Sequence, residues 1–274
     1  MNFIEKLNSA TGKNNSLLCI GLDPDPKLMP EAIDVFDFNK AIIDATNDLV
    51  CAYKPNLAFY EALGEGGMEA LRRTVKHIPP HIPVIADAKR SDIGNSARGY
   101  ATALFSYLGF DAATVNPFLG FDSVEPFLQY RDKGTLILCR TSNPGAVDFQ
   151  SLRCETGQGL RPLFEIIATK AEEWNTNSNI GLVVGATYPQ ELKLIRDQHP
   201  SLPLLIPGVG TQGGELELVV RYGVNAAGEG AIINSSRQVL YASRGKDFAQ
   251  AARRVALALR EQINRYRYRK TGDK

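Results

Sequence analysis

The chain has 274 residues, and its 31 lysines and arginines nearly balance its 30 aspartates and glutamates, which leaves a net charge of +1. This balance gives no support for binding to nucleic acid or to a membrane surface, and no apolar stretch is long enough to span a bilayer. The N-terminal residues lack the long apolar core of a signal peptide, and the four cysteines (Cys19, Cys51, Cys139 and Cys154) include no Cys-x-x-Cys pair. We therefore expect a cytoplasmic protein with reduced thiols.

Short apolar runs typical of buried strands alternate along the chain with amphipathic, helix-like segments. Eight strands are predicted, at 17–22, 50–54, 84–88, 112–116, 135–140, 181–185, 204–207 and 226–233. Helices are predicted at 38–49, 68–78, 96–108, 159–174, 191–198 and 214–222, with a last one at 247–266. Within this series, Thr187 and Gln190 flank Pro189 in the pattern of a capped helix start.

This strict alternation indicates a parallel sheet. Eight such units in a chain close to the usual length of about 250 residues predict an α/β protein, a (β/α)8 TIM barrel. An open doubly wound sheet is the main structural alternative. Because no shift of composition marks a boundary, residues 1–274 are expected to form a single domain. The longest connection, at about 142–179, is expected to carry its own helix and to pass over the mouth of the barrel.

Polar side chains stand at the predicted end of one strand after another, where the catalytic loops of a barrel lie. They are Asp23, Lys54, the run Asp87–Asp92, Asn116, the run Arg140–Ser142, the run Gly208–Gly214 and the run Asn234–Arg237. Each alone has an ordinary explanation as a turn residue, a helix cap or a solvated charge. Their joint placement at one end of the barrel favours a functional site.

The most informative of these runs is Asp87-Ala88-Lys89-Arg90-Ser91-Asp92. Side chains two residues apart on a strand point the same way, so Asp87 and Lys89 are expected to project together, with Asp92 just beyond. Each carboxylate favours the charged form of the lysine, and the lysine favours both carboxylates. Such a site keeps all its members charged, which suits proton transfer or repulsion of a negative group.

The run Gly208-Val209-Gly210-Thr211-Gln212-Gly213 matches Gly-x-Gly-x-x-Gly literally. A dinucleotide-binding fold is rejected, because too few residues follow to complete it and seven units precede it. A phosphate site is the better interpretation, because barrels often bind phosphate in the loops after the seventh and eighth strands. Backbone amides would bind the anion there, and Arg237 would add a bidentate contact.

The three histidines, His77, His81 and His199, lie before strands or beside prolines, on the side away from the predicted site. They are expected on the surface, and no metal site is predicted, since metal-dependent barrel enzymes usually use histidine ligands.

Taken together, these residues resemble the orotidine 5'-phosphate decarboxylase family. The resemblance runs from Gly21-Leu22-Asp23 to Ser236-Arg237 and centres on the family's Asp-x-Lys-x-x-Asp run, here Asp87 to Asp92. The segments Lys54-Pro55-Asn56 and Thr141-Ser142-Asn143-Pro144-Gly145 are similar to the longer bacterial-type branch. The resemblance implies a barrel that decarboxylates orotidine 5'-monophosphate to uridine 5'-monophosphate, without a cofactor, in de novo pyrimidine biosynthesis.

The resemblance also implies a role for each matching residue. Lys89 would deliver a proton to the ring carbon that loses carbon dioxide, and Asp87 would sit against the substrate carboxylate. Lys54 would pair with the acids and contact the ribose. Asp92 would reach across a homodimer interface into the neighbouring site. The substrate would also be bound by Asp23 at the ribose, Ser142 at the pyrimidine, Gln212 and Arg237 at the phosphate, and Ser96, which stands where the family commonly has threonine.

Decarboxylation leaves its lone pair in the ring plane, where the ring's π system is a poor sink, so fixed charges must stabilise it. Two other functions remain open. A metal-dependent lyase acting on a sugar-phosphate acid would share the Asp-x-Lys-x-x-Asp run, although it needs an extra acid near the second strand, where this chain has Lys54. A non-catalytic phosphate-binding barrel would not need the full charged set.

Overall fold

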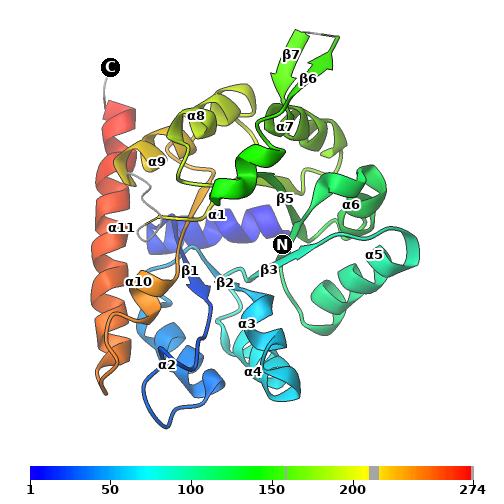
Figure 1. Ribbon diagram of the computed structural model, residues 1–274. Helices are drawn as coiled ribbons and strands as arrows, with labels where there is room; N and C mark the ends of the chain where they lie inside the picture. Colours follow the sequence, from blue (N-terminus) through cyan, green and yellow to red (C-terminus); the bar gives the residue numbers. More distant parts are fainter. Residues whose placement is uncertain (158, 210–215, 273–274) are drawn as a thin grey trace.

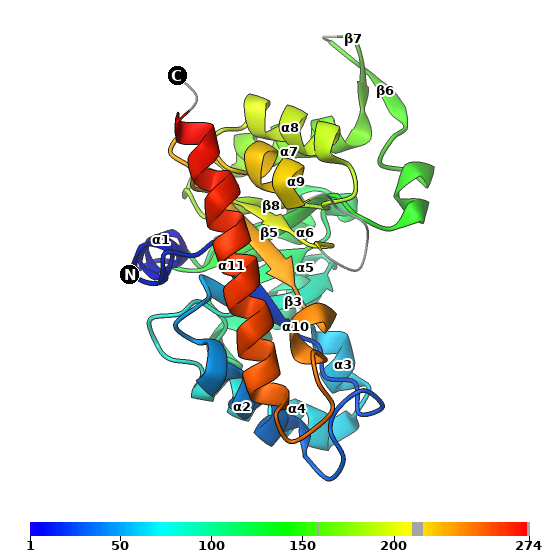
Figure 2. The same cartoon turned by 90° about the vertical axis from the view of Figure 1, so that its left-hand side faces the viewer.

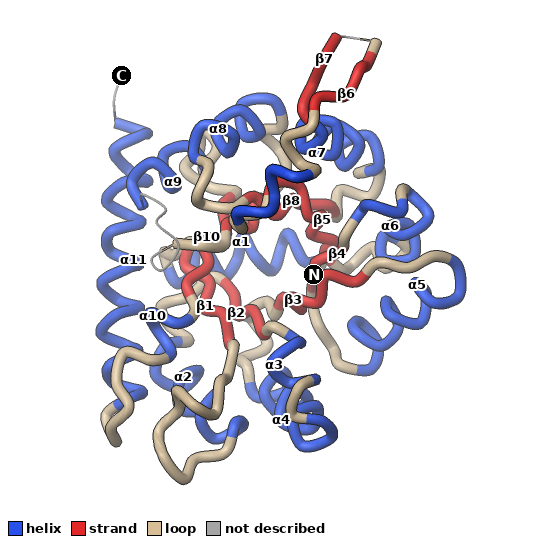
Figure 3. Tube along the Cα trace, in the orientation of Figure 1, coloured by secondary structure: helices blue, strands red, loops and turns tan. Residues whose placement is uncertain are grey.

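The computed structural model describes residues 1–157, 159–209 and 216–272, apart from the side chains of 269–272. Eight parallel strands form its main sheet, which the tube view shows as a ring (Figure 3). They are β1 (Leu18–Leu22), β2 (Ala52–Pro55), β3 (Ile85–Arg90), β4 (Ala112–Val115), β5 (Gly134–Arg140), β8 (Ile180–Val184), β9 (Leu204–Ile206) and β10 (Ala231–Ser235). The predicted strands are thus found in the predicted order.

The sheet closes on itself. Its order is β2-β1-β10-β9-β8-β5-β4-β3, so the last strand pairs with the first. The remaining edges, β2 and β3, are joined by the parallel bridges Tyr53–Val84 and Asn56–Asp87. This closure confirms the (β/α)8 barrel and excludes the open doubly wound sheet.

Helices cover the outside of the barrel (Figure 1). They are α2 (Val35–Thr46), α3 (Leu57–Glu61), α4 (Gly64–His77), α5 (Gly94–Ala101) with a π-helical extension η1 (Thr102–Tyr107), η2 (Pro117–Leu119), α6 (Phe121–Leu128), α7 (Leu163–Trp174), α8 (Pro189–Gln198), α9 (Leu216–Gly223), α10 (Arg237–Leu240) and α11 (Phe248–Gly272). Strand residues alternate between two cores. Leu18, Ile20 and Leu22 pack outward against helices, whereas Cys19 packs inside the barrel. This period of two decides which residues face the barrel axis.

The N-terminal end of the barrel is closed by α1 (Phe3–Asn14), a helix that the sequence patterns did not predict (Figure 2). Its start carries a capping box, in which Asn2 and Glu5 each bond the other's backbone N–H. Phe3 and Leu7 insert into the inner core. A Cβ on Gly134 would lie 2.3 Å from the Phe3 ring, so this close approach requires glycine. Substrate access is therefore expected from the opposite end.

The expectations for the last strand and for the start of α8 were wrong. The last strand spans 231–235 rather than 226–233, because Asn225 accepts the N–H groups of Ala227 and Glu229 in a turn. Thr187 does not cap α8; its hydroxyl donates to the carbonyl of Ser142 instead, and Pro189 alone marks the first helical turn.

The long connection holds more structure than its predicted helix. It begins with η3 (Pro144–Asp148) and continues as an antiparallel hairpin of β6 (Arg153–Thr156) and β7 (Gly159–Pro162). Its helix therefore starts at Leu163 rather than at 159, since that segment is paired as a strand. The hairpin projects from the barrel on the side away from α1 (Figure 2).

Candidate active site

A pocket of about 590 Å³ opens at the carboxyl ends of the strands. Lys54, Asp87, Thr114 and Asn234 occupy the inward-facing positions of β2, β3, β4 and β10 there. Farther down the same strands the inner face is apolar. The barrel axis thus changes from a hydrophobic core to a polar pocket. The rest of the lining includes Asp23, Asn56, Lys89, Ser142, Gly208, Ser236 and Arg237.

Two lysines share one carboxylate at the centre of the pocket. Lys54 Nζ lies 2.5 Å from Asp87 Oδ2, and Lys89 Nζ lies 2.5 Å from Asp87 Oδ1. The Lys54 side chain is only 3% exposed, whereas that of Lys89 is 50% exposed and faces the open pocket. The sequence prediction that Asp87 and Lys89 project together is confirmed, and Lys54 joins them.

Electrostatics keep Asp87 and Lys54 charged. Burial opposes the ionised form of Asp87, but Lys54 and Lys89 outweigh it and hold the pKa of its carboxyl well below the usual range. Burial likewise opposes the charged form of Lys54, but Asp87 and Asp23 outweigh it and raise its pKa. Cys19 lies close enough for these charges to act on it, yet burial dominates and raises the pKa of its thiol to about 12. The thiol therefore stays protonated and inert.

The strand that carries Asp87 and Lys89 is not regular. Its pairing with β4 shifts register between Ala86 and Arg90, and Lys89 adopts a φ of +46°. The Thr114 hydroxyl accepts the N–H groups of Ala88 and Lys89 at 3.0 and 2.9 Å. A β-bulge of this kind re-aims a side chain next to a site.

Asp23 lies just after β1, at the edge of the pocket. The Tyr241 hydroxyl donates to the carbonyl of Asp23 at 2.8 Å and accepts the N–H of Asp25 at 2.7 Å, which fixes the backbone on both sides of Pro24. Within the described part of the chain, Asp23 Oδ1 and Asn234 Oδ1 are buried oxygens without a hydrogen-bond partner. Both belong to pocket-lining residues, so the site offers acceptors for a polar ligand.

The loop that carries Ser142 is held at several points. The Gln150 side chain accepts the N–H of Thr141 and donates to its hydroxyl, both at 2.8 Å. A Cβ on Gly185 would lie 2.7 Å from the Ser142 nitrogen, so the strand and loop approach as closely as glycine permits. These contacts place Ser142 in the pocket wall.

Behind this loop, Arg140 ends β5 as a fully buried side chain. It is bonded to Glu191, and its guanidinium stacks 3.8 Å from the centre of the Tyr188 ring. A buried arginine must be paired in this way. Arg140 therefore supports the pocket wall and does not line the pocket.

The other predicted site residues fall into three groups. Arg237 lines the pocket as the exposed first residue of α10. Gln212 lies outside the described residues. Asp92 and Ser96 do not line the pocket formed by their own chain; Asp92 follows β3, and Ser96 is exposed on α5.

The expectation that all three histidines are surface residues was wrong for His199. It is 4% exposed, and its Nδ1 lies 2.7 Å from Glu172. Its partner Glu172 lies 27 residues earlier in the sequence, a contact that a linear pattern cannot reveal. None of the histidines lines the pocket. Among the residues that the structure describes, no group of three or more histidine, cysteine or acidic side chains is placed to hold a metal ion, and no helix is long and apolar enough to cross a membrane.

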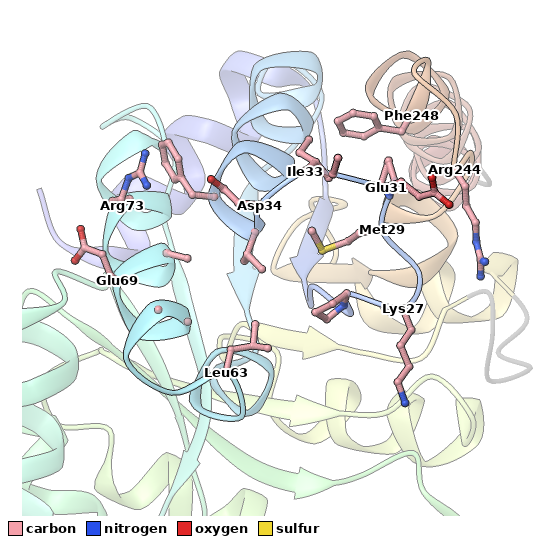
Figure 4. Close-up of a pocket in the computed structure, with 18 of the residues that line it drawn as sticks. Lys27, Met29, Glu31, Ile33, Asp34, Leu63, Glu69, Arg73, Arg244 and Phe248 are labelled. Carbon is pink, nitrogen blue, oxygen red and sulfur yellow. The ribbon is translucent and has the colours of Figure 1, made fainter.

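A larger cavity, of about 1270 Å³, lies between the loop after β1, α4 and the start of α11 (Figure 4). Its labelled charges are of both signs and point in different directions, with Glu69 and Arg73 on one side and Lys27 and Arg244 on the other. None of the paired charges Lys54, Asp87 and Lys89 lines it. The smaller pocket is therefore the candidate active site.

Several residues of this site were missed from the sequence. Thr114 was placed within a predicted strand without a role, and Asn234 was included in the polar run 234–237 without a role of its own. Tyr241 and Gln150 were not noticed. Tyr241 and Asp23 are 218 residues apart in sequence, so no local pattern predicts the hydrogen bond between them. Asn234 had a signal, since it stands in the polar run that follows the apolar core of the last strand.

Comparison with known proteins identifies relatives of the whole chain. The model of the orotidine 5'-phosphate decarboxylase / HUMPS family matches residues 16–255. Proteins named orotidine 5'-phosphate decarboxylase are similar, including one from Dehalococcoides mccartyi strain 195 (54% identity, covering 98% of this chain and 100% of the relative) and one from Herpetosiphon aurantiacus (56%, covering 93% and 96%). The structure of Leishmania donovani OMP decarboxylase superposes with a TM-score of 0.87 at 41% identity, covering 98% and 100% of the two chains.

Proposed function

We propose that Lys54, Asp87 and Lys89 carry out the reaction of this chain, which belongs to the orotidine 5'-phosphate decarboxylase / HUMPS family. The reaction converts orotidine 5'-monophosphate to uridine 5'-monophosphate and carbon dioxide in pyrimidine biosynthesis. The single observation that carries the proposal is the carboxylate of Asp87 held between two ammonium groups at the mouth of the barrel.

Lys89 is proposed as the acid. Its ammonium group is the more exposed of the two and faces the pocket, so a ring carbon that gains negative charge can lie beside it and take its proton. Two unit charges 4 Å apart interact by about 4 kcal/mol at an effective dielectric of 20, so this one contact can supply a substantial part of the barrier reduction.

Asp87 is proposed to face the substrate carboxylate. Because the two lysines keep Asp87 ionised, it repels a second carboxylate brought next to it. Departure of neutral carbon dioxide removes this repulsion, and the carbanion left behind is then neutralised by Lys89. Lys54 is buried and already paired, so its role is to hold Asp87 charged and in place.

Binding is proposed to spread around the rest of the pocket. Asp23 is proposed to accept ribose hydroxyls, which is supported by its buried, unpartnered Oδ1. Ser142 is proposed to bond the pyrimidine from the loop that Gln150 holds. Arg237, together with Gln212, is proposed to bind the phosphate. The remote phosphate would then contribute binding energy that positions the ring.

A homodimer is proposed for the assembly, with Asp92 and Ser96 acting in the partner's pocket. Neither residue lines its own chain's pocket. The elements α5, η2 and α6, of which α5 packs on α6 and α6 on η2, expose several large apolar side chains at or next to their ends: Ile93, Tyr100, Phe118, Leu119 and Phe121. Phe118 alone is 76% exposed, and clustered apolar side chains of this kind usually mark an interface.

We further propose that the 274 residues act as one domain and that the enzyme, with its reduced cysteines, is cytoplasmic.

The metal-dependent lyase is not favoured by any observation. The position where it would need an extra acid holds Lys54, and Lys54 already occupies one oxygen of Asp87. A purely binding role is also not favoured, because binding alone does not call for two lysines on one buried carboxylate.

The test is a spectroscopic assay with orotidine 5'-monophosphate, with and without chelator. Decarboxylation that persists with chelator is expected; absent activity, or activity lost with chelator, contradicts the proposal.

Arg237→Ala should lower kcat/KM by about 10- to 100-fold, the effect of one hydrogen bond to a charged group. Orotidine, which lacks the phosphate, is the control substrate: its kcat/KM should not change, and an equal loss for both substrates would remove Arg237 from the phosphate site.

A further inference from the structure

The catalytic lysine stands on a strained piece of backbone. Lys89 has a φ of +46°, a conformation that side chains with a Cβ rarely adopt. Such strain persists only where the surroundings impose it. The group that imposes it here is on the neighbouring strand, because both consecutive N–H groups of the bulge, from Ala88 and Lys89, donate to Thr114 Oγ1.

The hydroxyl of Thr114 uses both its acceptor positions and its donor hydrogen in hydrogen bonds. It has two lone pairs and one hydrogen, and the two backbone N–H groups take up both lone pairs. Its own hydrogen is then left to donate, and Asp87 Oδ1 lies 3.3 Å away. This is the same oxygen that Lys89 Nζ contacts at 2.5 Å. One buried hydroxyl thus bonds the backbone of Lys89 and the carboxylate that its ammonium group meets.

We propose that Thr114 is a positioning residue for the reaction, whose hydroxyl sets the bulge that aims Lys89 at the reacting carbon. The proposal rests on the proposed role of Lys89. Thr114 is 1% exposed and acts through Lys89 and Asp87. Its methyl group could be replaced without consequence, but its oxygen could not, since valine in its place would leave two partly buried N–H groups without their acceptor.

The test compares Thr114→Val with Thr114→Ser. Because an error of about 1 Å in a catalytic group can cost about a hundredfold, Thr114→Val should lower kcat by about 10- to 100-fold. Thr114→Ser, which keeps the oxygen, should stay within about threefold of the parent. The Kd for uridine 5'-monophosphate, whose ring no longer carries the carboxylate, should change by less than about threefold in both variants, and a general structural defect would not spare it.

Thr135→Val is the matched control. Thr135 is fully buried on the adjacent strand β5, and within the described residues its hydroxyl has no hydrogen-bond partner. The kcat of Thr135→Val should equal that of the parent.

Equal kcat for Thr114→Val and the parent, or an equal loss of kcat in the valine and serine variants, would overturn the proposal. If Thr114→Val does not fold, Thr114→Ala takes its place, and equal kcat for alanine and serine overturns the proposal. Inactivity of the parent enzyme would instead contradict the proposed function.

Discussion

At the scale of single residues, the site depends on one carboxylate that serves two cations. Lys54 is buried and Lys89 is exposed, although both contact Asp87 at the same distance. Burial makes Lys54 dependent on its partner, because an uncompensated buried charge is costly. Exposure leaves Lys89 able to meet the substrate. Because their surroundings differ, the two lysines are proposed to have different roles.

Lys89→Ala should separate chemistry from binding. We expect kcat to fall by about a thousandfold or more, because the variant loses the group proposed both to donate the proton and to stabilise the carbanion. The Kd for uridine 5'-monophosphate, measured by calorimetry, should change little, since the exposed ammonium group does not support the fold. Near-normal turnover would remove Lys89 from the mechanism.

Asp87→Asn should destabilise the protein by about 3–5 kcal/mol at pH 7, the usual effect of removing one partner of a buried ion pair. Asp87 has a lowered pKa, so its contribution to stability is present above the unfolded value of about 4 and is lost as the pH falls through the folded value. Lys54 has a raised pKa, so its contribution is present below about 10.4 and is lost as the pH rises through the folded value. The pair therefore stabilises the fold throughout the range from about pH 4 to pH 10.

Urea unfolding at several pH values in this range measures the effect. Glu173→Gln is the control, because Glu173 pairs with Lys170 at 2.7 Å with both side chains about half exposed. The free energy of unfolding of Glu173→Gln should fall by less than about 1 kcal/mol. Similar losses in the two variants would show that burial does not make the Lys54–Asp87 pair special.

For the strand that carries Asp87 and Lys89, the sequence predicted the side-chain orientation but not the bulge. Alternation along a strand was enough to predict that Asp87 and Lys89 face the same way. It could not predict the bulge, because the register shift and the positive φ of Lys89 depend on Thr114 from another strand. The segment Ala112–Val115 has no polar–apolar alternation, so nothing in it marks the Thr114 side chain as inward-facing.

At the scale of elements, the loop after β1 is fixed by a residue near the other end of the chain. Tyr241 follows α10, and its hydroxyl bonds the backbone of both Asp23 and Asp25. Its ring stacks on Phe38 of α2 with 6.1 Å between centroids, and burial raises the pKa of its hydroxyl to about 12. The hydroxyl is therefore protonated at every working pH and always able to donate.

Tyr241→Phe should raise KM for orotidine 5'-monophosphate by about 3- to 30-fold with little change in kcat, because it releases the loop that carries Asp23, the proposed ribose-binding residue. Steady-state kinetics provide the measurement. Tyr53→Phe is the control: Tyr53 is fully buried, and its hydroxyl bonds Thr46 and the carbonyl of Ile43, away from the pocket. It should lower Tm without changing KM. A KM that rises equally in both variants would argue against a specific role for Tyr241.

Elements with a periodic pattern were predicted well, and elements defined by long-range contacts were not. The strands pack on both faces and read as apolar runs. The helix α1 and the β6–β7 hairpin were not foreseen. The first is recognisable only once the barrel end that Phe3 and Leu7 fill is known. The second is a short, mostly exposed pair whose residues carry no hydrophobic signal.

At the scale of the whole molecule, closure of the barrel gathers residues separated by about 180 positions of sequence. Lys54 and Asn234 face one pocket because β1 pairs with both β2 and β10. The sequence contained enough to predict this closure, since eight strand–helix units have few other arrangements. What it could not supply is the outside of the barrel, where large apolar side chains from Ile93 to Phe121 are exposed and, like Asp92, do not line the pocket.

A shared site in the proposed homodimer makes a prediction that one chain alone cannot satisfy. Each complete site would take Lys89 from one chain and Asp92 from its partner. In a mixed dimer of Lys89→Ala and Asp92→Ala, one site would then carry both substitutions and the other neither. Random pairing makes half of the dimers mixed, so mixing equal amounts of the two inactive variants should restore about a quarter of the parent activity. The variants are unfolded and refolded together, and kcat per site is measured.

The matched control mixes Lys89→Ala with Asp87→Asn. Both residues belong to the same chain's half of the site, since their side chains are in contact. Every site in that mixture would carry at least one defect, so no activity should return. Recovery in the first mixture and none in the second requires Asp92 to act across the interface. If neither mixture recovers while both remain dimeric by light scattering, each site is self-contained and Asp92 serves its own chain.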